Sequence, residues 1–468
     1  MSSVVPPADQ SRVTIGPAPA WVRVQAADES YRPAGGQPYT HLLLDEQYHA
    51  GLREHYTHTV QRLETLGAVR AASQWRFDFD PATQEVVIHS LLVRRAGAAV
   101  EHAQPERLRF LQREEQLDRY VMHGQVTVLV LLEDVRPGDI LDLSLTTRSR
   151  PRLLPDRFWF FVSVPSEVPL RMCRFSIRFP KGRRFAWKAY APGFAPVIEQ
   201  AEGETTWRWT MENTVALEPE AQVPTWLLPP LWLQVSDCAS WQEVIAAVGG
   251  AWQEALDGPE LTRKAEEIAL AAETLAQRVE KALEFVQDEI RYLSVNIELG
   301  GQIPAAPGDV LRRRYGDCKD KSFLLSQLLR RLGVPARPVL VNSLWRQSVQ
   351  ELLPTPDAFD HAVVEYELEG RRYWADATLT LQGGGARNRP VPDLRLGLPL
   401  SPGAKGLEPA PPPAAESAYE LHETYYLDTT AGPSQLLVQV AARGSYAEEL
   451  RRALVSEGAE AVAKSREQ

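Results

Sequence analysis

The sequence predicts a multidomain α+β protein, in which an N-terminal all-β sandwich precedes a core of helices and antiparallel strands. In the first half of the chain, apolar and polar residues alternate, as between Cys173 and Phe179, and this period of two is typical of half-buried strands. In the second half, apolar residues recur every three or four positions between Ile268 and Ile290, as in helices. Many strands without helical patterns between them indicate a sandwich.

The strands of the sandwich are expected between about residues 35 and 235. Each is a short run of alternating or clustered apolar residues between turn residues; the runs are 75–79, 86–93, 126–132, 140–145, 173–179 and 207–211. Arg136-Pro-Gly-Asp139 lies between two of these runs, and its Pro-Gly centre predicts a type II turn. Cys173 shares a strand face with three apolar residues, so we expect it in the core.

The second half begins with Ser240-x-x-Glu243, a capping box that predicts a helix to about Leu256. The apolar stripe from Ile268 to Ile290 predicts one long helix or two consecutive ones. Leucines at helical spacing then follow Cys318 as far as Leu332. Residues 336–342 are expected to form a strand, and residues 361–378 a β-hairpin.

These patterns divide the chain into five segments. Residues 1–30 lack periodicity and are expected to be a tail or a loosely docked arm. Residues 31–235 form the β-sandwich domain, whose function the sequence does not reveal, and residues 236–398 form the domain of helices and antiparallel strands. A Pro-rich linker covers 399–415. We expect 416–468 to begin a third β-containing unit, which is either truncated or a small appendage.

Composition excludes several classes of protein. The 468 residues are 44% hydrophobic and 24% charged, and a net charge of −10 gives nucleic-acid binding no electrostatic support. Three cysteines cannot make a disulfide framework, and no C-x-x-C pair indicates zinc. No apolar run has the length of a signal-peptide core or a membrane span. We therefore expect a cytoplasmic protein without a transmembrane segment, cofactor or metal; oligomeric state has no signal.

The strongest chemical signal is residues 311–322, Leu-Arg-Arg-Arg-Tyr-Gly-Asp-Cys-Lys-Asp-Lys-Ser. The leucine pattern places Cys318 in the first turn of a helix that Gly333 ends. The unpaired N–H groups of a helix start stabilise a thiolate, and the flanking Lys319 and Lys321 would act in the same direction. We interpret Cys318 as a nucleophile. The competing interpretation is a buried small hydrophobic residue.

A nucleophilic thiol needs an imidazole nearby and a group that orients the imidazole. His361, just downstream of the cysteine, opens an apolar run that Glu369-Gly370 separates from a second run, which predicts a hairpin with a two-residue turn. Counting back from this turn places His361 opposite Thr378. Asp376 then lies on the same face, about 7–8 Å away along the diagonal. A register shift of one residue would put Asp376 on the opposite face.

Three motifs, Gly-Asp-Cys-Lys-Asp-Lys (316–321), Asp-His-Ala (360–362) and Tyr-Trp-Ala-Asp-Ala-Thr (373–378), together resemble the bacterial transglutaminase-like family of the papain-type cysteine peptidase clan. The resemblance covers about residues 255–400. It implies a papain-like or transglutaminase-like core with Cys318 as nucleophile, His361 as base and Asp376 as orienting carboxylate. Ala377 departs from the family pattern, which usually has proline. The preceding segment resembles an uncharacterised β-rich domain found upstream of such cores, and many relatives are exported.

The expected function is that of a thiol enzyme acting on amide or isopeptide bonds of a protein or peptide through a thioester. Water as acceptor gives a peptidase and an amine gives an acyltransferase, and the residues do not choose between them. Gln302, in a Gly-rich loop, is a candidate oxyanion donor beside the backbone N–H of Cys318. We expect no calcium dependence, because no Asp/Asn loop has calcium-binding spacing.

Two alternatives remain at this point. The core could be a scaffold without catalysis, in a binding or assembly module whose β-sandwich recognises a partner. Alternatively, Cys318, His361 and Asp376 could hold a metal ion, although flanking lysines would repel a cation.

Overall fold

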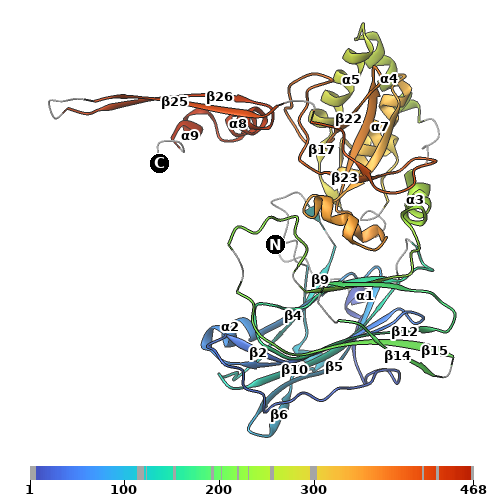
Figure 1. Ribbon diagram of the computed structural model, residues 1–468, viewed down its shortest axis with the longest axis vertical. Coiled ribbons are helices and arrows are strands. Elements are labelled where there is room, and N and C mark those ends of the chain that lie inside the picture. The colour runs from blue at the N-terminus through green and yellow to red at the C-terminus, as the bar shows by residue number, and fades with distance from the viewer. Residues whose placement is uncertain are drawn as a thin grey trace. The chain divides into compact units, whose positions relative to one another are not determined.

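The structure is a computed structural model (Figure 1), which divides into two compact units. The first unit contains Met1–Glu243, Val295–Gln302 and Gln350–Thr355, and the second contains Val244–Ser294, Ile303–Val349 and Pro356–Gln468. The residues that the structure describes are 7–112, 121–122, 124–150, 154–190, 194–201, 203–218, 221–229, 231–252, 258–295, 303–413, 416–427 and 432–464.

One large sheet organises the first unit. Its nine strands follow the order β1-β5-β10-β3-β2-β12-β15-β14, and β6 pairs with β5 outside this path. Most neighbours are antiparallel, but β12 runs parallel to β2, and β1 runs parallel to β5. The strands are β1 (Val13–Ile15), β2 (Tyr39–His49), β3 (Glu54–Leu63), β5 (Gln84–Arg95), β6 (Ala98–Glu101), β10 (Ile140–Ser149), β12 (Leu170–Pro180), β14 (Val197–Ala201) and β15 (Glu204–Thr214).

Two three-stranded sheets complete the sandwich. One contains β4 (Gln74–Phe79), β9 (Val126–Leu131) and β7 (Arg109–Gln112), and the other contains β11 (Trp159–Ser163), β16 (Trp232–Ser236) and β13 (Ala186–Tyr190). Each shares a core with part of the large sheet: Val128 packs in one core, and Leu233 packs in the other. Alternating side chains supply these cores, so the predicted sandwich is confirmed. The unit also contains β8 (Val121–Met122) and two short helices, α1 (Pro7–Gln10) and α2 (Leu66–Ala72).

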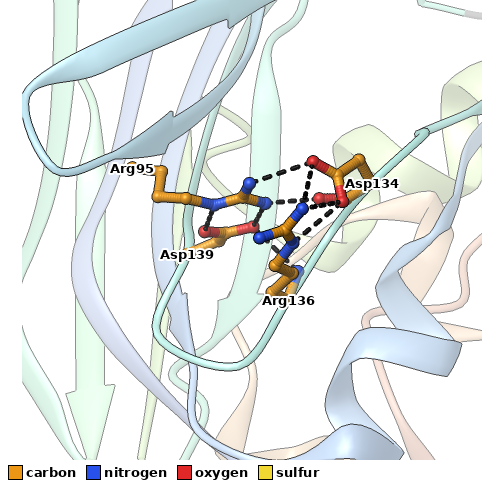
Figure 2. A network of polar contacts seen from close by, with 4 residues as sticks. All are labelled: Arg95, Asp134, Arg136 and Asp139. Carbon is orange, nitrogen blue, oxygen red and sulfur yellow. Dashed lines mark hydrogen bonds and ion pairs between the residues drawn. The ribbon is translucent and has the colours of Figure 1, made fainter.

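The Pro-Gly turn between β9 and β10 has the expected geometry. The N–H of Asp139 donates to the Arg136 carbonyl at 3.1 Å, and Gly138 has φ +92°, as a type II turn requires. Figure 2 shows how Arg95, the last residue of β5, holds this turn: its Nε and Nη2 each donate to the Asp139 carboxylate at 2.7 Å. Arg136 donates to Asp134. Hydrogen bonds from Arg95 hold the pKa of Asp139 below its ordinary value.

The segment expected to be a tail or a loosely docked arm contacts the sheet of the first unit from Val13 onward. Residues 13–15 form β1 on the edge strand β5. Farther along, Trp21 Nε1 donates to Glu54 at 2.6 Å, and the backbone N–H of Arg23 donates to Gln47 at 3.0 Å. Polar side chains of the sheet therefore hold this arm, defined as residues 16–32. Because polar contacts hold the arm, its sequence shows no apolar periodicity.

Helices and a five-stranded antiparallel sheet form the core of the second unit (Figure 1). The sheet order is β22-β21-β20-β23-β24, and leucines of α7 pack with Val364 of β21 in one buried cluster. The expected first helix ends at Gly249 and is shorter than predicted. The elements of this unit are α4 (Pro259–Leu270), α5 (Leu275–Glu284), α6 (Pro307–Arg313), α7 (Cys318–Arg331), β17 (Arg291–Tyr292), β19 (Tyr315–Gly316), β20 (Ala336–Val341), β21 (His361–Leu368), β22 (Arg371–Ala375), β23 (Leu396–Pro399) and β24 (Glu408–Pro409). Two further elements, α3 (Trp241–Gly249) and β18 (Ser294–Val295), contain residues of both units.

The C-terminal part of the second unit is a hairpin followed by helices. The elements are β25 (Ala418–Tyr426), β26 (Gln435–Arg443), α8 (Ser445–Ser456) and α9 (Ala459–Lys464). Helix α8 is attached to the unit's core by two residues: Glu448 accepts from the N–H of Gly383 at 3.1 Å, and Arg451 donates to the Leu381 carbonyl at 2.8 Å. Throughout the described ranges, the helices lack the length and apolar composition needed to cross a bilayer.

Candidate active site

The predicted cysteine helix is present, and Cys318 is its first residue. Asp317 is the N-cap and accepts from the N–H groups of Lys319 and Asp320, while Asp320 accepts from the N–H of Asp317 in return. This capping box fixes where the helix starts. A Cβ at Gly316 would lie 2.7 Å from Cβ of Asp320, so the position before the cap admits only glycine. The motif thus places Cys318 at a helix N-terminus, half-exposed and free.

The two flanking lysines have other partners than the thiol, which corrects the expectation that they stabilise a thiolate. Nζ of Lys319 contacts the carboxylate of Asp317. Lys321 is fully buried, and its Nζ donates to the carbonyls of Ile290 at 2.6 Å and Gln287 at 3.3 Å. Helical periodicity could not reveal the partners of Lys321, because they lie about thirty residues upstream.

The hairpin that carries His361 and Asp376 has the predicted register. Leu368 pairs with Arg371, and both residues of the turn, Glu369 and Gly370, have positive φ (53° and 73°), as a type I′ turn requires. The paired ladder continues to Val364 and Ala375. One step farther along, the chain leaves β22 and delivers the Asp376 side chain to His361.

The structure brings together the three residues that the sequence singled out. Nε2 of His361 lies 2.9 Å from Oδ2 of Asp376, and the side chains of His361 and Cys318 share a hydrogen bond. Because Asp376 takes Nε2, Nδ1 is the ring nitrogen left for the thiol. Burial lowers the pKa of His361, but the Asp376 carboxylate and the Cys318 contact outweigh it, so this pKa is well above its ordinary value. The arrangement favours a charged imidazole beside the thiol.

The second carboxylate oxygen of Asp376 also accepts hydrogen bonds, and these help to keep the group ionised. Oδ1 accepts from the backbone N–H of Thr378 at 2.9 Å and from its hydroxyl at 2.6 Å. Burial raises the pKa of Asp376, yet His361 and Thr378 together bring it below its ordinary value. The carboxyl therefore stays ionised and fixes the orientation of the imidazole.

Residues outside the three motifs hold these segments in place. The hydroxyl of Ser322 in α7 donates to the Ala362 carbonyl in β21 at 2.9 Å, beside His361. Nε2 of Gln287 donates to the backbone carbonyl of Asp376 at 2.8 Å, and its Oε1 accepts from the buried Arg389. Gln287 lies in a π-helical turn, Phe285–Glu289. Sequence reasoning missed Gln287 and Arg389, since a lone amide in an apolar stripe has no distinctive pattern.

Tyr292 is a further neighbour of the site. It lies on β17, which pairs in parallel with β19 directly before the N-cap of α7. Burial raises the pKa of its phenol, and the nearby Cys318, Asp317 and Asp376 add to this effect. The phenol therefore stays protonated.

The sequence also singled out Gln302, two further cysteines and a possible metal site. Gln302 lies outside the described residues. Cys173 and Cys238 are buried free thiols, as expected for structural residues. In the described ranges, no group of three His, Cys, Asp or Glu side chains has a geometry that could hold a metal ion, and this includes Cys318, His361 and Asp376.

Two family models match this chain, one in its first half and one in its second half. Residues 262–377 match the family model of the transglutaminase-like superfamily, and residues 49–218 match a domain of unknown function with a solved structure, DUF3857. The first match contains Cys318, His361 and Asp376. A search of curated proteins found no match.

Among solved structures, the chain resembles a protein from Parabacteroides distasonis that is described as a proposed protease. The two are 18% identical with a TM-score of 0.65, and the match covers 79% of this chain and 72% of the other. A proposed cysteine protease from Cytophaga hutchinsonii is 14% identical with a TM-score of 0.22, over 62% of this chain and 86% of the other. The first likeness shows a shared fold. The chain therefore carries a transglutaminase-like core, preceded by a DUF3857 domain.

Proposed function

We propose that this protein is a cysteine-dependent enzyme that cleaves amide or isopeptide bonds in a protein or peptide substrate. The observation that carries the proposal is the contact series from Cys318 through His361 to Asp376, assembled from a helix start and a hairpin within one unit. A scaffold role would not require an ionised carboxylate, a charged imidazole and a half-exposed thiol in hydrogen-bond contact.

The chemistry follows from these contacts. His361 holds the proton given up by the Cys318 thiol, as an imidazolium, and the thiolate attacks the carbonyl carbon of the substrate amide. The tetrahedral intermediate collapses as the C–N bond breaks, and the imidazolium gives its proton to the leaving amine. A thioester on Cys318 remains. Water, deprotonated by His361, attacks this thioester and releases the acid and the thiol.

The developing negative charge on the substrate oxygen needs hydrogen-bond donors. The backbone N–H of Cys318, at the start of α7, is our candidate for one donor. Gln302 is our proposed second donor. An amine in place of water would give transamidation by the same steps, and we propose hydrolysis as the main reaction.

Trapping the acyl-enzyme tests the proposal. The protein is mixed with a library of peptide amides, quenched in acid within milliseconds and measured by intact mass. We expect an added acyl mass on Cys318 that hydroxylamine removes, because thioesters react with hydroxylamine. Cys318→Ala should carry no such mass and should lose at least about a thousandfold in peptide cleavage.

The buried Cys173 and Cys238 serve as internal controls, because a thiol-specific reaction at the site should leave both unmodified. Adding methylamine separates the two acceptors: hydrolysis gives free acids and transamidation gives methylamides. Equal peptide cleavage by the wild type and Cys318→Ala would overturn the proposed function.

A further inference from the structure

A hollow lies on the outer face of the large sheet in the first unit, on the side opposite the core residues Phe175 and Ile177. It is open to the solvent and has room for only a small polar group. Two small side chains line it, Ser176 of β12 and Thr206 of β15, which lie diagonally across the two paired strands. The other residues that line it are Trp21, Arg23, Gln47, Tyr48, Arg174, Arg178 and Arg208.

Several hydrogen-bond donors in this hollow are uncommitted. In the described part of the chain, the hydroxyls of Ser176 and Thr206 and the terminal nitrogens of Arg178 take part in no hydrogen bond with another side chain. The ion pair of Arg178 with Glu204 joins Nε to the carboxylate at 2.6 Å, and this contact lacks hydrogen-bond geometry. Arg178 and Thr206 are directly paired across the sheet, and Ser176 is one position away on the same face. Arg178, Thr206 and Ser176 therefore lie on one face of the sheet at adjoining positions.

The charges around the hollow do not balance. Arg174 pairs with Asp45, and Arg178 with Glu204. Arg23 and Arg208 share the single carboxylate of Glu199. Four guanidinium groups thus share three carboxylates. One positive charge is left over.

The nearby His49 does not change this excess. Its ring also faces Glu204, at 3.4 Å, but burial lowers its pKa, so the ring is uncharged at neutral pH. The excess positive charge is not needed to hold the arm in place either. The contacts that hold Arg23 come from Arg174, Gln47 and Glu199, whereas the free donors belong to Arg178, Ser176 and Thr206.

We propose that this hollow binds the carboxylate group of a ligand. A guanidinium with two free terminal nitrogens matches the two oxygens of a carboxylate. One carboxylate also cancels the single excess charge, whereas a doubly charged phosphate would leave the site negative. Trp21 and Arg23 of the arm also line the hollow. This site would give the DUF3857 domain a recognition function for acidic ligands.

Calorimetric titration of the full chain tests this proposal. The probes are the peptide acetyl-Gly-Glu-Gly-amide, its neutral counterpart acetyl-Gly-Gln-Gly-amide, glucuronate and inorganic phosphate. We expect saturable binding of the Glu peptide, with a Kd of about a millimolar for one buried group, and no binding of the Gln peptide. Glucuronate binding as tightly as the Glu peptide would support recognition of the carboxylate alone, and tighter peptide binding would support a peptide as the source.

Three variants locate the site. Arg178→Gln should weaken binding at least about tenfold, because a charge-assisted pair is lost. Ser176→Met should fill the hollow and weaken binding similarly. Arg171→Gln is the matched control on the same strand, since its partners are Asp28 and Glu212, and it should bind as the wild type does. Absence of binding, phosphate binding as tight as the Glu peptide, or unchanged affinity in a folded Arg178→Gln variant would each overturn the proposal.

Discussion

Replacing Asp376 by asparagine is expected to slow the cleavage of peptide amides about a hundred- to ten-thousandfold. The Asp376 carboxylate is what keeps the His361 imidazole charged despite its burial. Without that negative charge, burial dominates and lowers the pKa of His361, so the imidazolium that pairs with the thiolate becomes rarer. Comparing kcat/KM of the two proteins between pH 5 and 9 measures the effect, and we expect the loss to be smallest at the acid end of this range, where the imidazole of the variant still binds a proton.

The matched control for this variant is Asp360→Asn, one residue before His361. The Asp360 carboxylate accepts from the N–H and the hydroxyl of Ser343 and makes no contact with the three site residues. It should retain most of the activity. If a folded Asp376→Asn variant kept more than about a third of the wild-type rate, Asp376 would not have the orienting role proposed here.

Replacing Lys321 by methionine is expected to destabilise the second unit by about 2–4 kcal/mol. The methionine has similar length but cannot donate to the buried carbonyls of Ile290 and Gln287. Those carbonyls belong to the segment whose Gln287 side chain holds Asp376. Urea unfolding at pH 7.5 measures the change. Lys281→Met, an exposed lysine on α5, is the control and should change stability by less than about 0.5 kcal/mol.

The stability deficit of Lys321→Met should also depend on pH. Burial lowers the pKa of Lys321 to about 8, from an ordinary value of 10.5. Between these values the unfolded chain binds more protons than the folded chain, so the stability that Lys321 contributes rises with pH. The deficit should therefore be larger at pH 9.5 than at pH 7.5. A deficit that shrinks over this range would contradict the buried position of the ammonium group.

The parts of the site that could be predicted are those set by local rules. A two-residue turn fixes the hairpin register, so Glu369 and Gly370 were enough to place His361 and Asp376 on one face. Likewise, Asp317 and the leucine spacing place Cys318 at a helix start. Both depend on contacts between residues close in sequence.

The parts that could not be predicted depend on distant polar contacts. Lys321 has its partners in a π-helical turn about thirty residues upstream, and Gln287 reaches Arg389 about one hundred residues away. The arm is another example, since residues 16–32 are held by charged side chains of the sheet. Single polar residues of this kind carry no periodicity, and their partners become known only with the fold.

The most direct measurement of the central claim is the rate of Cys318 alkylation by iodoacetamide from pH 4 to 9, read by intact mass, in the wild type and in His361→Ala. An ordinary thiol, which titrates near pH 8.5, would react roughly two hundred times more slowly at pH 6 than at pH 9. We predict that wild-type Cys318 loses less than about tenfold over this range, and that His361→Ala shows the full loss. A wild-type profile like that of an ordinary thiol, or one unchanged in His361→Ala, would contradict an activated Cys318–His361 pair.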